Sequence, residues 1–176
     1  MTLKINYDDL TQAMETRDPL GVHRSYFDTQ TGDVLLIGDW VEGQARMAGD
    51  PDELDIPDMR LAWYLLWNDG EIEAAWPEVE AADREQQAEA YLKRFLLIPT
   101  TPSYKGYQDM VDFVDTVPHA HLRAQLDVAL DGKGAFRRFK NVLLRYPHER
   151  ERWFAFSDQR QRERADAWLR EQGVKN

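Results

Sequence analysis

Two short apolar runs on either side of a polar loop predict a β-hairpin near the start of the chain. Residues 24–28 (Arg-Ser-Tyr-Phe-Asp) and residues 33–37 (Asp-Val-Leu-Leu-Ile) are separated by the sequence Thr-Gln-Thr-Gly. A loop of this length that ends in glycine is typical of hairpins in which the glycine has a positive φ. We therefore predict two antiparallel strands with Gly32 in the left-handed region. A helix capped by Asn6 or Asp8 should precede them.

Apolar residues at intervals of three and four positions predict a series of helices in the rest of the chain. Capping residues, prolines and glycines mark where most of these helices begin and end. The expected helices run from Pro77 to Lys93, from Ser103 to Val114, from after Pro118 to Gly132, from Gly134 to Tyr146, and from Ser157 or Asp158 to Gly173.

Three further segments are less regular. Residues 94–98 and 153–156 are short apolar runs bounded by turns, so we predict that they add strands to the hairpin. Residues 60–67 are also strongly apolar, but a run of this length does not decide between a buried strand and a helix. Residues 38–59 are rich in Gly, Pro and Asp and predict a long loop or lid.

Together the elements predict an α+β fold. A small antiparallel sheet, made of the hairpin and isolated strands, should pack against a cluster of C-terminal helices. We expect a single domain over residues 1–176, in which residues 38–90 form an acidic insert or lid. Apolar stripes on two helices predict a core that includes Phe136, Phe139, Leu143, Trp168 and Leu169.

The composition indicates a folded protein and excludes several kinds of chemistry. Hydrophobic residues make up 43% of the chain and aromatic residues 11%, which is enough to bury a core. The absence of cysteine excludes disulfides, zinc ribbons and thiol catalysis. The apolar runs are shorter than a membrane span, and the first residues do not resemble a secretory signal. We therefore expect a cytoplasmic protein that does not enter the membrane.

Charge is distributed unevenly along a chain whose net charge is −10. Residues 1–99 contain 8 Lys and Arg against 21 Asp and Glu, whereas residues 100–176 contain 14 against 11. Such a distribution indicates either that the two halves neutralise each other or that the basic part binds an anion. The net acidity argues against binding to duplex DNA, because affinity for a duplex depends on neutralising its phosphates.

A basic turn at residues 131–140 is the candidate binding site. Its sequence, Asp-Gly-Lys-Gly-Ala-Phe-Arg-Arg-Phe-Lys, places a Gly-Lys-Gly turn before a helix and three basic residues in the first two turns of that helix. Basic residues near a helix N-terminus oppose the helix dipole, at a cost of roughly 0.3–1 kcal/mol each, while the free amides there attract anions. We predict an anion site made of Lys133, Gly134, Arg137, Arg138 and Lys140.

Three functions are compatible with this turn. The first is a non-enzymatic binding or regulatory module whose ligand is a small anion or an acidic protein segment. The second is an enzyme for a phosphorylated or carboxylated small molecule, with Lys133 and Arg137 as anion clamps beside a deep pocket that holds an acid of perturbed pKa. The third is an RNA-associated protein, in which Trp153 or Phe156 is exposed for base stacking.

A fourth interpretation gives the turn no ligand at all. Asp131, Asp158 or carboxylates from the acidic first half of the chain would then neutralise its basic residues. Binding of an external anion and internal neutralisation predict different effects of substitution on the stability of the empty protein. If the site holds an external anion, replacing Arg137 and Arg138 together should leave the empty protein as stable as before, or slightly more stable.

No further motif indicates catalysis or a cofactor. Of the four histidines only His119 and His121 are close in sequence, and no pattern of carboxylates and histidines completes a metal site with them. The sequence contains neither a Gly-x-Ser-x-Gly elbow nor a phosphate-binding loop of the Gly-x-x-x-x-Gly-Lys-[Ser/Thr] type. We predict neither a metal nor a cofactor.

Residues 132–140, Gly-Lys-Gly-Ala-Phe-Arg-Arg-Phe-Lys, resemble the core of an uncharacterised bacterial protein family. The resemblance continues through Arg-Trp-Phe-Ala-Phe at residues 152–156 and the final helix, and it includes the hairpin. It covers roughly residues 24–38 and 91–174. No activity is assigned to that family, so the resemblance implies no catalytic residues.

Overall fold

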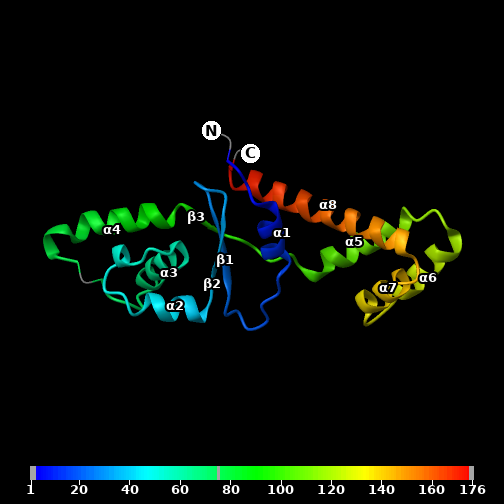
Figure 1. Ribbon diagram of the computed structural model, residues 1–176, viewed down its shortest axis with the longest axis horizontal. Helices are drawn as coiled ribbons and strands as arrows, with labels where there is room; N and C mark the ends of the chain where they lie inside the picture. The colour runs from blue at the N-terminus through cyan, green and yellow to red at the C-terminus, as the bar shows by residue number, and fades with distance from the viewer. Residues whose placement is uncertain (1–2, 75, 175–176) are drawn as a thin grey trace. The chain divides into compact units, whose positions relative to one another are not determined.

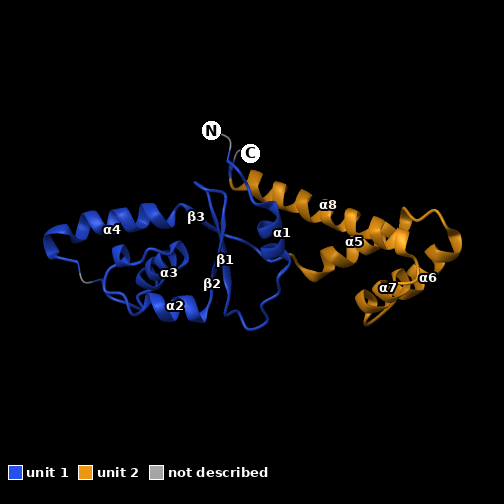
Figure 2. Cartoon of the chain, viewed as in Figure 1, with its two compact units in different colours: residues 1–100, 173–176 blue, residues 101–172 orange. Residues whose placement is uncertain are grey.

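The chain forms two compact units, which Figure 2 shows in different colours. The computed structural model describes residues 3–74 and 76–174. Unit 1 consists of residues 1–100 and 173–176, and unit 2 consists of residues 101–172. The organisation as a single domain with an acidic insert stays a prediction.

Unit 1 combines helices with a small sheet. Its elements are α1 (Tyr7–Glu15), β1 (Arg24–Asp28), β2 (Val34–Ile37), α2 (Asp39–Ala45), the 3-10 helix η1 (Pro51–Glu53), α3 (Pro57–Asn68), α4 (Glu78–Leu92) and β3 (Phe95–Leu97) (Figure 1). The sheet is antiparallel with the strand order β2-β1-β3, and Tyr26 lies opposite both Leu35 and Leu97. Gly32 has φ +83°, and the side chain of Asn6 accepts a hydrogen bond from a first-turn amide of α1. The predicted hairpin, glycine conformation and helix cap are thus confirmed.

The segment between the hairpin and α4 is largely helical, which corrects the prediction of a long loop at residues 38–59. It contains α2 and η1, and α3 begins at Pro57, whose fixed φ suits the first position of a helix. The apolar run at residues 60–67 is therefore part of a helix. Five residues on different sides of α3 are buried, so this helix lacks the polar face that reveals a helical period in a sequence.

The core of unit 1 forms between one face of the sheet and the helices that follow the hairpin. Side chains of the two hairpin strands, among them Tyr26 and Ile37, join the buried residues of α3 in one apolar cluster. The indole of Trp63 in this cluster donates a hydrogen bond to the carbonyl oxygen of Ala48 at 3.1 Å. α1 lies on the other side of the strands from α3 (Figure 1), so the sheet is sandwiched between helices.

A buried ion pair joins the hairpin to the start of β3. Asp28 is 4% exposed, and its carboxylate accepts hydrogen bonds from Nη2 and, at 2.6 Å, from Nε of Arg94. It also accepts one from the amide of Gln30 at 2.8 Å. Burial opposes ionisation of this carboxyl, but the hydrogen bonds outweigh burial and hold the pKa of Asp28 below its ordinary value.

Unit 2 consists of helices packed around aromatic side chains. Its helices are α5 (Ser103–Asp115), α6 (Ala120–Leu130), α7 (Ala135–Leu143) and α8 (Pro147–Glu171). The ring of Phe139 meets those of Phe113 and Trp153 edge to face, with centroids 6.2 and 4.9 Å apart.

In the described part of the chain, no helix is both long and apolar enough to cross a membrane.

The predicted strand from Trp153 to Phe156 is wrong, because these residues lie inside α8. Trp153 and Phe156 are one helical turn apart and both join the aromatic core, whereas Phe154 between them is exposed. Four apolar residues are too few to display this period, which is why the run suggested a strand. The start of the final helix is likewise corrected from Ser157 or its neighbour to Pro147, which occupies the first turn of α8.

Four of the five predicted core residues are buried. Phe136 is the exception, since it is 40% exposed. It lies at the edge of α7, where its ring approaches Gly106 of α5; a Cβ at that glycine would be 3.4 Å from the ring. The apolar stripe of α7 is therefore narrower than its sequence suggests.

Replacing Phe139 with alanine should strongly destabilise unit 2. The ring is fully buried among other aromatic rings, and truncations of this kind cost about 3–5 kcal/mol. Urea unfolding followed by tryptophan fluorescence measures the loss. Leu144→Ala, at an exposed position next to the end of α7, is the matched control and should change stability by less than about 0.5 kcal/mol. Equal stability of the two variants would contradict the assigned core.

Replacing Asp28 with asparagine should destabilise the protein at neutral pH and much less in acid. Removing one partner of a buried ion pair costs about 3 kcal/mol. The pKa of Asp28 is lowered on folding. Ionised Asp28 therefore contributes its full stabilisation above the pKa of the unfolded chain, about 3.9, and this stabilisation is lost as the pH falls through the pKa of the folded protein. Urea unfolding at neutral and acidic pH should show the two proteins converging in acid. Asp33→Asn, at an exposed hairpin position, should behave like the wild type.

Candidate functional site

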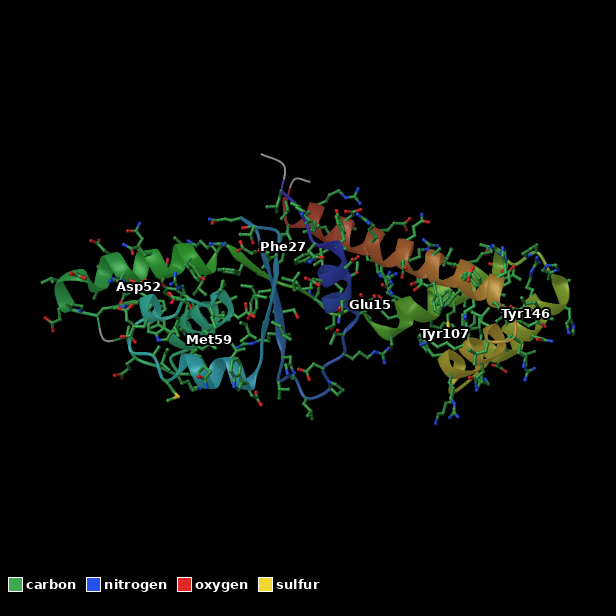
Figure 3. All side chains as sticks on the ribbon, in the orientation of Figure 1. Glu15, Phe27, Asp52, Met59, Tyr107 and Tyr146 are labelled. Atoms are coloured by element: carbon green, nitrogen blue, oxygen red, sulfur yellow. The ribbon has the colours of Figure 1, made fainter. Side chains whose placement is uncertain are left out.

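The turn between α6 and α7 reverses the chain within a few residues. Its two glycines have positive φ, +70° at Gly132 and +81° at Gly134, a conformation that other residues rarely adopt. α7 begins directly after Gly134, and α6 and α7 pack against each other. On the other side of α6, the hydroxyl of Tyr107 donates a hydrogen bond to the carbonyl oxygen of Leu130 at 3.1 Å (Tyr107 is labelled in Figure 3). The Gly-Lys-Gly sequence therefore forms a tight connection whose start is fixed by α5.

Arg138 folds back over this turn. Its Nε donates to the carbonyl oxygen of Ala129 at 3.1 Å, and its Nη atoms donate to the carbonyl oxygens of Asp131, Gly132 and Lys133. The last carbonyl groups of a helix have no partner within the helix, and a guanidinium offers several donors in a fixed geometry. Arg138 thus caps the end of α6 and holds the turn.

The other three basic residues of the turn point into solvent. Lys133, Arg137 and Lys140 are exposed, and within the described residues none of them forms an ion pair. Residues 132–148 contain no Asp or Glu that could neutralise them locally. Positions three and four apart lie on one side of a helix, so α7 presents one continuous surface to solvent. On the helix this surface consists of Arg137, Lys140, Asn141 and the adjoining Leu144. Together with Lys133, which lies in the turn before the helix, we call it the basic face of α7.

The arginines of α8 have a different environment. Arg160 lies 2.8 Å from a carboxylate oxygen of Asp112, and Arg164 lies 2.9 Å from one of Asp109. Both acids belong to α5, and Asp109 is buried. Internal neutralisation of basic residues therefore occurs between α5 and α8, whereas the basic face of α7 receives none from the described carboxylates.

A groove of about 280 Å³ lies between α6 and α7, next to the basic face. Val128, Ala129 and Val142 supply its apolar lining. Its polar lining consists of Gln125, Arg138, Asn141 and Arg145. None of the described residues that line the groove carries a carboxylate, so the groove offers apolar contacts and hydrogen-bond donors but no acid–base pair.

The aromatic residues considered for base stacking face the interior. Trp153 is buried, and its ring centroid lies 5.3 Å from that of Phe113. Phe156 is half-buried in the same cluster and lies under the guanidinium of Arg160, which is 5.2 Å from the ring centroid. Among the residues that the structure describes, no three His, Asp or Glu side chains gather as a metal site would require.

Sequence reasoning missed two parts of this site. Arg145 follows Arg138 by seven positions, which is two helical turns, so the groove side of α7 could have been recognised from spacing. The contribution of α6 could not be recognised in this way, because the contact between α6 and α7 is a tertiary contact that sequence periodicity does not encode. The carbonyl partners of Arg138 could not be predicted for the same reason.

Arg137 and Arg138 should respond oppositely to substitution. Arg138→Gln removes charge-assisted hydrogen bonds to the α6–α7 turn and should destabilise the protein by about 1–3 kcal/mol. Arg137→Gln removes an exposed charge that opposes the helix dipole, so stability should stay the same or rise by up to about 1 kcal/mol. Urea unfolding of the two single variants tests this. Equal losses in both would contradict the separate roles of these adjacent residues.

Known proteins place the chain in a family. It is 33% identical over 172 residues to the UPF0158 protein PA5073 of Pseudomonas aeruginosa. The aligned region covers 98% of this chain and 85% of that protein. No solved structure matches the chain. The family described as "Uncharacterised protein family (UPF0158)" matches residues 46–176. The resemblance to an uncharacterised family is thereby confirmed, while the nine-residue core as its signature stays a prediction. This chain belongs to the uncharacterised protein family UPF0158.

Proposed function

We propose that this protein is a non-enzymatic binding module of the cell interior, and that the basic face of α7 holds an acidic protein segment. One observation carries the proposal: Lys133, Arg137 and Lys140 are exposed without carboxylate partners among the described residues, in a chain whose net charge is −10. Carboxylates are plentiful in this protein, and elsewhere in unit 2 they pair with arginines. Basic residues left without such partners favour an external acidic ligand.

The spacing of the cations favours an extended ligand over a small anion. Lys133 precedes α7, Arg137 lies in its first turn, and Lys140 lies about one turn further, or roughly 5 Å along the axis. A small anion is held by groups that converge on one point, as at a phosphate site. Groups spaced along a helix instead match a segment whose carboxylates repeat at a similar interval.

Features around the basic face favour binding over the other two functions. Among the described residues that line the adjacent groove there is no carboxylate, which gives catalysis no acid or base at this place. The rings of Trp153 and Phe156 pack in the core of unit 2, which leaves an RNA ligand without the expected stacking platform there.

A fluorescein-labelled oligoglutamate peptide tests the proposal by fluorescence anisotropy. Wild-type protein should bind the peptide, and Arg137→Gln with Lys140→Gln should weaken binding by about tenfold, because each exposed ion pair contributes up to about 1 kcal/mol. The matched control is Lys4→Gln with Arg17→Gln, which removes the same charge from exposed positions of unit 1 and should bind like the wild type. If both variants bound the peptide equally weakly, the loss of affinity would come from net charge alone. That result would contradict a binding site on α7. Preferential binding of single-stranded oligouridine over the peptide would overturn the proposal in favour of RNA.

A further inference from the structure

We infer that the acidic segment bound by the basic face of α7 is helix α4 of a second copy of this chain. The inference rests on the proposed function, since it names the partner of the same surface. Its basis is that one chain carries two helical surfaces of opposite charge, each without ion-pair partners among the described residues. The two surfaces belong to different units, α4 to unit 1 and α7 to unit 2.

α4 is acidic and its carboxylates are exposed. In its unit, Arg84 pairs with Asp52, which is labelled in Figure 3; the Nη1 to Oδ2 distance is 2.8 Å. No other basic residue lies within α4. The remaining acids of the helix form no ion pair within the described residues; they are Glu78, Glu80, Asp83, Glu85 and Glu89.

The exposed side of α4 is also small and partly apolar. Val79 is 91% exposed, and positions three or four apart place Asp83, Gln86 and Ala90 on the same side of the helix. Only Ala88 of α4 is buried, so this helix contacts its own unit through a narrow stripe. A second helix could therefore approach this outer side closely, because the side chains of Val79, Asp83 and Ala90 are short.

The basic face of α7 is complementary to that surface in both charge and shape. Leu144 is 60% exposed among the cations, much as Val79 is exposed among the acids. The groove between α6 and α7 adds an apolar recess beside Asn141. Packing α4 on α7 would cover both exposed aliphatic side chains. It would also bring Glu80 and Asp83 to Arg137 and Lys140, because the members of each pair are three positions apart on their helix. Burial of apolar groups together with charge pairing gives the contact more specificity than charge alone.

The physical character of such a contact follows from its size and symmetry. α7 has 9 residues and α4 has 15, so the interface is small and the association should be weak and sensitive to salt. The two surfaces are different, which makes the contact head to tail. Contacts of this kind produce rings or open chains rather than closed pairs.

Sedimentation of two charge-reversal variants, alone and mixed, tests the inference. One variant carries Arg137→Glu and Lys140→Glu, so the contact positions of both helices are acidic. The other carries Glu80→Lys and Asp83→Lys, so the contact positions of both helices are basic. At low salt the wild type should sediment above its monomer mass of 20.6 kDa and return to that mass when salt shortens the screening length to about 3 Å. Each variant alone should remain monomeric. Their equimolar mixture should associate, because each then supplies the surface that the other lacks.

Control variants separate this contact from a general effect of charge. Lys4→Glu with Arg17→Glu, and Asp55→Lys with Glu73→Lys, change the net charge equally at exposed positions outside both helices, and they should associate like the wild type. Circular dichroism verifies that all variants are folded. A monomeric wild type at low salt, a mixture that stays monomeric, or variants that associate normally would each overturn the inference. In any of these cases, oligoglutamate binding that still depends on Arg137 and Lys140 would leave the proposed function intact, and its absence would remove both.

Discussion

The arrangement of unit 2 around its basic residues depends on the guanidinium of Arg138. It gathers carbonyl oxygens from the last turn of α6 and from the connection that follows, and so fixes where α7 starts and how it is rotated. Successive residues of a helix are rotated by about 100°, so fixing Arg138 toward the turn also fixes the direction of its neighbours. Arg137 and Lys140 must then point away from α6. A structural arginine thereby orients two residues of the proposed binding surface.

The arginines of α7 and α8 differ in whether a carboxylate lies beside them. On α8, Arg160 and Arg164 face carboxylates of α5 and join two helices. On α7, the same residue type has no acid within seventeen consecutive positions of the chain, from residue 132 to residue 148. The composition of the whole chain obscures this contrast because its acids outnumber its bases. Local separation of charge, rather than net charge, gives the protein its candidate interaction surface.

How far the sequence predicts this structure depends on whether each feature is local. The hairpin with Gly32, the cap at Asn6 and the helices of the C-terminal half follow from short-range patterns, and they were predictable. α3 was ambiguous because it is buried on most sides, and the start of α8 was misplaced because four apolar residues near Trp153 carry no clear period. At the site, the charges of Lys133, Arg137 and Lys140 could be recognised, whereas the role of Arg138 could not. Its carbonyl partners belong to another helix and are positioned only by the tertiary fold.

The order of strands in the sheet has a consequence for how the protein is made. β1 is the central strand, yet its second neighbour, β3, comes from a much later part of the chain, as the 66-residue separation between Asp28 and Arg94 shows. A ribosome adds about 5–20 residues per second, so one edge of β1 stays unpaired for several seconds after the hairpin has been synthesised. An unpaired strand edge is a template for pairing with other chains. Until Arg94 reaches Asp28, the nascent protein is therefore exposed to aggregation, and the ion pair marks the point in synthesis at which that exposure ends.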